Sequence, residues 1–470
     1  MLIQLVRTLD PAEFKQWGRF VHAAYFNTHK NTARLYDYLA RYYPELTAPH
    51  LKSEIVFEAL FPGQPYRDDW LRTLRKYLLQ LLSEFLGIHR FREDPVWLGI
   101  FKVTALQEKA HPAMFERQLK RINQSFKQDS PQSETNLLQG FYLADLQFTH
   151  HVQQDHQQAL ADLQIANQRL DHFYLWAKLR LLCGEINLRT LVGAQPYESE
   201  PVTLLWPYLE AQLATFPAPL QAYIHAAHFL SGRPDEESAY LRLRELLGTS
   251  ANGMEHSDLL NFYGFAVNYA YRAYRRGQPH RLQDMLDLYR EMLALNLLIE
   301  GGHISEANYR NITTLSLRLG EYEWGANFVE GYKPQLPENI RDSAYRYNLA
   351  HVYYYQRHYG MALKLMQWVA VSDVFYALSF RVLQLKIYFD QQEIEVFYSH
   401  VQSTRIFIRR LGNKQVPPSR REAYRNFVKL ARQIFRLKHE GKGDSDQILT
   451  EISQADYLVE KEWLLAKMES

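Results

Sequence analysis

The sequence predicts an all-α protein: an α-solenoid of antiparallel helical hairpins, with an N-terminal helical domain before it and C-terminal capping helices after it. Apolar residues recur every three to four positions along most of the chain, whereas alternating strand-like runs bounded by turn residues are scarce. At 470 residues the chain is longer than one compact core usually needs, which favours several domains or one extended array. With 47% hydrophobic and 23% charged residues, its composition is that of a folded chain.

Residues 1–130 are predicted to form an N-terminal helical domain, because they contain several helix signals. Asp10-Pro11-Ala12-Glu13 has the residues of a capping box, which predicts a helix reaching about Tyr25. Further helices are expected near 31–43 and 51–60. An apolar stripe predicts a core-facing helix that stops at Gly87; its members are Trp70, Leu71, Leu74, Tyr77, Leu78, Leu81, Leu82 and Phe85.

From about Ser133 onward, a position for a small residue recurs in the second helix of each predicted hairpin. Two antiparallel helices approach closely only where one presents a small side chain, which gives the position its physical meaning. The intervals between successive positions run from 34 to 43 residues, which indicates a repeat array over 131–411. These positions are Ala159, Val202, Ala239, Leu282, Gly325, Ala362 and Val396.

Two neighbouring segments carry a more specific signal. Residues 319–326, Leu-Gly-Glu-Tyr-Glu-Trp-Gly-Ala, are followed by Val329, Tyr332 and Pro337 and resemble the turn and second helix of a tetratricopeptide repeat. In the next hairpin the corresponding positions hold Ala350, Tyr353, Tyr359, Ala362, Met366 and Val369. The resemblance spans 133–410 and is closest over 305–370. It implies a right-handed solenoid with a concave groove, although regular family members repeat every ~34 residues.

In repeats of this kind, one turn of each first helix faces the groove. Asn268, Asn311 and Asn348 each lie fourteen residues before a small-residue position, so the resemblance places them on that turn. An asparagine amide can pair with both the N–H and the C=O of an extended peptide. Alternatively, each asparagine bonds within the fold. Further residues expected to line the groove are Tyr271, Tyr274, Arg275, Arg310, Thr314, Arg318, Tyr347, His351 and Tyr354.

The C-terminal part, 412–470, is predicted to contain a helix over about 420–438 and a last helix over about 455–468. The net charge of the whole chain is only +2, but 405–442 contains twelve Lys and Arg against Glu422 and Glu440. Five of these cations share one helical face, where they could bind phosphates of a nucleic acid or form a solvated surface. They are Arg421, Arg425, Lys429, Arg432 and Arg436.

Catalytic and metal-binding signatures are scarce in the sequence. It has no Gly-rich phosphate loop, nucleophile elbow or zinc-protease motif. His225 with His228, and the cluster of His150, His151 and His156, lack further ligands at a telling spacing. We therefore expect no enzyme activity, cofactor or metal.

The sequence also indicates where the protein works and what kind of partner it has. Its single cysteine, Cys183, lies among apolar residues, and no segment reads as a signal peptide or membrane span. A cytoplasmic location without membrane attachment follows. The expected function is a non-catalytic interaction scaffold that binds an extended protein segment in its groove. The alternative is a nucleic-acid-associated protein that uses 405–442.

Overall fold

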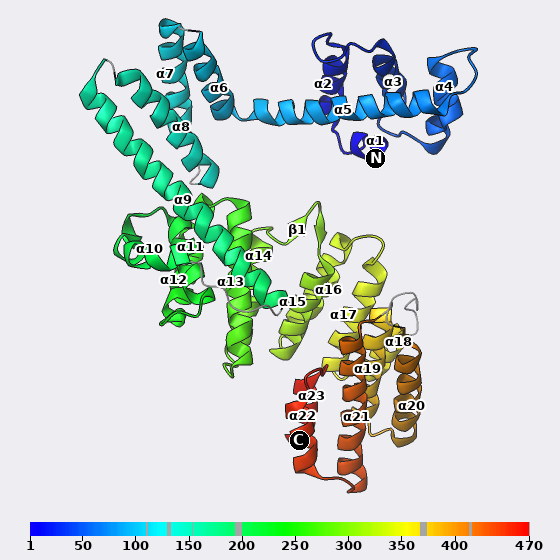
Figure 1. Cartoon of the computed structure of the whole chain (residues 1–470). Coiled ribbons are helices and arrows are strands. Elements are labelled where there is room, and N and C mark those ends of the chain that lie inside the picture. The colour runs from blue at the N-terminus through cyan, green and yellow to red at the C-terminus, as the bar shows by residue number, and fades with distance from the viewer. Residues whose placement is uncertain are drawn as a thin grey trace. The chain divides into compact units, whose positions relative to one another are not determined.

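The computed structural model describes residues 1–109, 111–128, 133–152, 154–192, 200–366, 374–412 and 416–469. Contacts between Cα atoms divide the chain into two compact units, Met1–Ala177 and Lys178–Ser470, and the division falls inside helix α9 (His156–Val192). The regular structure in the described residues is α-helical apart from short 3-10 turns and one two-stranded hairpin (Figure 1). The predicted all-α class is confirmed.

The first unit begins with five helices around one core. The longest of them, α5, contributes Leu71, Leu78 and Leu82, all fully buried. Each such side chain contributes about 1.5–3 kcal/mol through the hydrophobic effect. The five helices are α1 (Leu2–Val6), α2 (Pro11–His22), α3 (Lys30–Ala40), α4 (Ser53–Leu60) and α5 (Asp68–Glu93), with the 3-10 turn η1 (Ala48–Leu51) before α4.

The predicted start of α2 is confirmed, whereas the predicted end of α5 is wrong. The Asp10 carboxylate accepts a hydrogen bond from the Glu13 amide, and the Glu13 carboxylate accepts one from the Asp10 amide, each at 2.8 Å. Helix α5 runs through Gly87, because one glycine costs a helix only about 1 kcal/mol. It ends before Asp94, whose position ahead of Pro95 disfavours helical backbone.

A second apolar cluster of this unit joins the helices that follow α5. It contains Ile100 and Val103 of α6, Phe115 and Ile122 of α7, and Leu143 of α8. This cluster spans residue 130, where the sequence analysis placed a domain boundary. The helices are α6 (Pro95–Glu108), α7 (Pro112–Gln128), α8 (Glu134–His151) and the first part of α9.

The second unit contains five successive antiparallel helix pairs, in which the two helices of each pair contact one another. First helices also meet, since α11 contacts α13, α15 contacts α17, and α17 contacts α19. The predicted array of helical hairpins is consistent with this arrangement. Helix α10 (Glu200–Ala211) precedes the pairs. The first three pairs are α11 (Ala218–Leu230) with α12 (Glu236–Ser250), α13 (His256–Arg275) with α14 (Arg281–Ala294), and α15 (Glu306–Arg318) with α16 (Tyr322–Tyr332). The last two are α17 (Arg341–Tyr355) with α18 (Tyr359–Met366), and α19 (Val374–Asp390) with α20 (Ile394–Arg410).

The same local turn closes all five pairs. A residue with positive φ follows each first helix, and the next amide donates to the carbonyl five residues earlier, which is the Schellman motif. Glycine avoids strain in this conformation, whereas the two other side chains must accept it. The positive-φ residues are Gly232, Gly277, Gly320, Arg357 and Gln392.

The small-residue positions fall in the first turn of the second helices. Ala239, Gly325 and Ala362 are buried there. At Gly325 an added Cβ would overlap the Ser316 hydroxyl of α15, so the glycine permits the close approach of α15 and α16. Two positions differ: Val396 is 42% exposed, and Leu282 is only partly buried. Val369 and Lys414 lie outside the described residues, and so does the side chain of Val202.

One connection between helix pairs contains two short β-strands. Strands β1 (Ile299–Glu300) and β2 (His303–Ile304) form an antiparallel hairpin whose two-residue turn is Gly301-Gly302, both with positive φ. Two other connections between pairs contain 3-10 turns, namely η3 (Ala251–Gly253) and η4 (Lys333–Gln335), and the turn η2 (Leu213–Thr215) precedes α11; the connection between α18 and α19 lies outside the described residues.

Three C-terminal helices complete the second unit: α21 (Pro418–Glu440), α22 (Ser445–Gln454) and α23 (Lys461–Glu469). Their apolar side chains share one core with α19 and α20, in which Phe427, Ile452 and Leu464 are fully buried. This core extends across residue 411, the second predicted domain boundary. The last predicted helix, 455–468, is wrong in its first part, because 455–460 connects α22 to α23 without helix.

In the described residues no helix combines the length and the apolarity needed to cross a membrane.

Gly325→Val is expected to lower the free energy of unfolding by about 1–3 kcal/mol, because the added atoms would overpack the α15–α16 contact. The matched control is Gly331→Ala in the same helix, where an added Cβ meets no atom within 4 Å. There the free energy of unfolding should rise by up to about 1 kcal/mol. Urea unfolding followed by circular dichroism measures both changes, and shifts of the same sign would contradict the close approach.

Candidate binding groove

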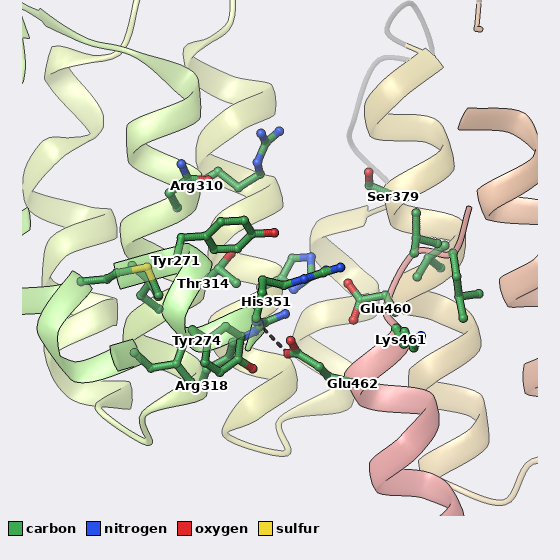
Figure 2. A pocket seen from close by; sticks show the side chains of 18 of the residues that line it. Tyr271, Tyr274, Arg310, Thr314, Arg318, His351, Ser379, Glu460, Lys461 and Glu462 are labelled. Atoms are coloured by element: carbon green, nitrogen blue, oxygen red, sulfur yellow. Dashed lines mark ion pairs between the residues drawn. The ribbon is translucent and has the colours of Figure 1, made fainter. Parts of the chain in front are cut away.

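A cavity of about 670 Å³ opens among the helices of the second unit. Its lining comes mainly from α13 and α15, with further residues from α14, α17, α19, α21, the connection between α22 and α23, and the start of α23. Figure 2 shows phenol rings, hydroxyls, guanidinium groups and carboxylates converging on it. Sites that bind ligands commonly have volumes of about 300–1,000 Å³ and a few such convergent polar groups.

Of the twelve residues predicted from the sequence to line the groove, Thr314 and nine others line this cavity. They come from three consecutive first helices because their spacing repeats: Asn268 and Asn311 are 43 residues apart, as are Arg275 and Arg318. The nine are Asn268, Tyr271, Tyr274, Arg275, Arg310, Asn311, Arg318, Tyr347 and His351.

Asn348 and Tyr354 were expected in the groove but lie in the interior. Asn348 is 2% exposed, and its amide donates to the Ala344 carbonyl one turn earlier in α17, at 2.8 Å. Tyr354 is 7% exposed; its hydroxyl donates to Asp390 at 2.7 Å and accepts from the Trp463 indole at 2.9 Å. For Asn348 the alternative of a bond within the fold holds, and the groove placement of Tyr354 is wrong.

The other two asparagines of the predicted ladder differ from one another. Asn268 is half-buried, and its amide donates to the Asn187 side chain of α9 at 2.6 Å. Asn311 is exposed and lies within hydrogen-bonding reach of the Tyr289 hydroxyl. Close to them, the Tyr271 ring is 52% exposed. Asn311 and Tyr271 are therefore accessible, as are Arg275, Thr314 and Arg318.

The sequence did not predict the connection between α22 and α23, of which residues 458–460 line the cavity together with Lys461 and Glu462 at the start of α23. No glycine or proline marks the break, so the segment was expected to be helical. Its last non-helical residue, Glu460, has a φ of +53°, a left-handed conformation that is unfavourable for a side chain of this kind. Such a conformation persists only where surrounding contacts hold it.

The contact that holds Glu460 is an ion pair with a buried lysine. Lys386 of α19 is 2% exposed, and its ammonium group donates to the Glu460 carboxylate at 2.8 Å. The same ammonium lies 4.8 Å from the ring centre of Tyr354, which adds a cation–π contact. Burial alone would raise the pKa of Glu460, but the charge and hydrogen bond of Lys386 prevail and lower it to about 2. The pair therefore stays ionised at neutral pH.

A second, more accessible ion pair lies at the other end of the same segment. The guanidinium of Arg318 and the carboxylate of Glu462 are 2.8 Å apart, with 33% and 47% of their side chains exposed (Figure 2). Exposed pairs of this kind contribute at most about 1 kcal/mol. Burial, and then the hydrogen bond to Glu462, raises the pKa of Tyr274, which places this phenol beside the same carboxylate.

His351 lies beside these charged groups. Burial, reinforced by the charge of Lys386 and opposed by that of Glu460, lowers its pKa to about 3. Its Nε2 atom has no hydrogen-bond partner within the described part of the chain. At neutral pH the imidazole is uncharged.

The basic stripe of α21 makes several contacts within the chain. The Arg421 guanidinium donates to the Leu411 carbonyl at 2.8 Å. Three others pair with carboxylates: Arg425 with Glu422 at 2.5 Å, Lys429 with Glu451 at 2.8 Å, and Arg436 with Glu440 at 3.8 Å. The guanidinium of Arg432 lies 6.0 Å from the ring centre of Tyr398.

The histidines and the cysteine singled out in the sequence are placed in ordinary packing environments. His151 pairs with Asp162 at 2.7 Å, and His228 contacts the Pro234 carbonyl at 2.6 Å. Burial lowers the pKa of His225 to about 4. Cys183 is fully buried, as predicted, and burial raises the pKa of its thiol. The part of the chain that the structure describes holds no group of three possible metal ligands.

No protein-family model, curated protein or solved structure matches this chain.

Glu460→Gln should lower the free energy of unfolding by about 3 kcal/mol, because it leaves Lys386 buried and unpaired. Adding Lys386→Met should restore most of this loss, since a thioether suits the ring-lined site that the ammonium occupies. Chemical denaturation of the two variants and the wild type measures the difference. If the double variant is no more stable than Glu460→Gln, the ion pair does not hold the connection.

Acidification should destabilise the protein partly through His351. In the unfolded chain a histidine takes up a proton near pH 6.5, whereas folded His351 resists protonation down to about pH 3. The stability contributed by the neutral ring is thus lost as the pH falls through this window, by up to about 1.4 kcal/mol per pH unit. Thermal unfolding at pH 7 and pH 5 should show a smaller loss for His351→Gln than for the wild type, and equal losses would contradict the assignment.

Proposed function

We propose that the second unit is a right-handed, tetratricopeptide-like repeat scaffold, and that its groove binds an extended segment of a partner protein without catalysing a reaction. Five equivalent Schellman turns and the small residues at the pair contacts support a repeat of one hairpin unit. The single observation that carries the proposal is the gathering of nine predicted groove residues around one cavity.

The chemistry of the lining suits a peptide. Tyrosine and arginine are the side chains that most often anchor protein interfaces, and the exposed ring of Tyr271 lines the same cavity as Asn311. An asparagine amide can donate to a peptide carbonyl and accept from a peptide amide at the same time. Together these groups can hold a backbone and still select among side chains.

A cytoplasmic location goes with this proposal, because the protein's one cysteine is buried and suits a reducing compartment. Nucleic-acid binding by 405–442 remains a prediction from the sequence. The carboxylates that pair with Arg425, Lys429 and Arg436 offset the charge with which α21 would attract phosphates.

Selection from a displayed library of random twelve-residue peptides tests the proposal. The wild-type protein should enrich a set of peptides, and the variant Tyr271→Ala/Asn311→Ala should bind them at least tenfold more weakly because it removes the accessible ring and amide. Affinities are measured by fluorescence anisotropy with labelled synthetic copies.

The matched control is Tyr208→Ala, which removes a tyrosine with 46% exposure on α10, outside the groove. It should leave the affinities unchanged. If no peptide is enriched, or if both variants bind all enriched peptides as the wild type does, the groove is not a peptide-binding site.

A further inference from the structure

The arginines and the carboxylates of the groove lining come from different parts of the chain. Four arginines of the lining come from earlier helices, namely Arg275 at the end of α13, Arg310 and Arg318 of α15, and Arg420 of α21, while Lys461, whose ammonium group donates to the Ser453 carbonyl at 3.3 Å, is the first residue of α23. Both carboxylates in the lining, Glu460 and Glu462, come instead from the connection between α22 and α23 or the start of α23. The wall that the repeat helices build is thus basic, and its acidic part is supplied by the chain's own C-terminal segment.

The two ends of this wall are equivalent in sequence but not in their contacts. Arg275 and Arg318 are the last residues of α13 and α15 and lie 43 residues apart, one repeat interval. Arg318 pairs with Glu462, whereas Arg275 is exposed and forms no ion pair or hydrogen bond within the described residues. The Arg318–Glu462 pair therefore shows which kind of group the equivalent position at Arg275 can accept.

We propose that the groove selects an acidic extended segment of a partner protein, and that Glu462 competes with this segment for Arg318. The inference rests on the proposed function and names its partner chemistry: carboxylates that bind Arg275, Arg310 and Arg318 while Tyr271 and Asn311 contact the rest of the segment. A guanidinium matches a carboxylate in both charge and geometry.

The two ion pairs of the connection play different parts in this competition. Glu460 is held by a buried lysine and stays in place, which keeps the connection attached to the groove. Glu462 is 47% exposed and pairs with a partly exposed arginine, so a partner carboxylate can replace it at little cost. Replacement leaves Lys386–Glu460, Trp463–Tyr354 and the buried Leu464 intact.

An acidic protein segment fits this lining better than a nucleic acid does. A phosphate backbone carries a charge at every nucleotide and binds by neutralising many of them on cations. In the groove, Glu460 is fixed among the cations and would repel such a backbone. A peptide can place a carboxylate opposite each arginine and a neutral residue beside Glu460.

The experiment uses the full chain and three labelled twelve-residue peptides, in which serine alternates with glutamate, glutamine or lysine. Fluorescence anisotropy should show binding of the glutamate peptide that is at least tenfold tighter than that of the other two. Arg275→Gln and Arg318→Gln should each weaken it several-fold, and Glu462→Gln should tighten it by about twofold to fivefold because Arg318 is released.

Arg409→Gln, which removes an exposed arginine of α20 outside the groove, is the matched control and should have no effect. Thermal melting verifies that each variant is folded. Tightening by Glu462→Gln is the result that a general charge effect does not explain on its own, since it must disappear in the double variant with Arg318→Gln.

The outcomes separate this inference from the proposed function. If the random library yields groove-dependent peptides that are neutral or basic, or if Glu462→Gln leaves acidic peptides unaffected, the acidic selection and the competition are refuted while the peptide groove stands. If no peptide binds at all, the proposed function fails as well. Tighter binding of polyuridylate RNA than of the glutamate peptide, lost in Arg275→Gln, would assign the groove to nucleic acid instead.

Discussion

The left-handed residue that ends each first helix is the constraint on which the groove depends. It closes the Schellman turn, reverses the chain, and sets the register between the two helices of a pair. Since the turn recurs at Gly277 and Gly320, residues at a fixed distance before it appear on equivalent faces of α13 and α15. That is how Asn268 and Asn311, or Arg275 and Arg318, come to line one cavity.

The parts of this arrangement that are local in sequence could be predicted. Helix periodicity, the capping box at Asp10 and the small residue at Gly325 each act over a few residues or one hairpin, so they leave a readable pattern. Register alone does not say what covers a helix face. Asn348 occupies the same offset as Asn311, yet it is buried in α17 and bonds to its own helix. Helix α17 contacts α15 on one side and α19 on the other.

The break in the C-terminal segment could not be predicted, because its cause lies far away in the chain. Residues 455–460 carry no strong helix breaker, and the left-handed conformation of Glu460 is held by Lys386, 74 residues earlier. Burying that lysine is unfavourable unless a carboxylate reaches it, so the fold favours an extended connection over a continuous helix. A sequence pattern records propensities but not such a pairing.

A segment held by two ion pairs of different strength can stay attached to the fold while one of the pairs is exchanged. The pair Lys386–Glu460 is strong because Lys386 is buried and cannot be left without a partner, whereas the exposed pair Arg318–Glu462 is weak because water screens it. Because Glu460 ends the connection and Glu462 lies in the first turn of α23, the first pair holds this segment in place while the second can be exchanged. A competitor for Arg318 then gains its binding energy without disturbing the core beneath, which is the condition for an internal segment to tune affinity and leave the fold unchanged.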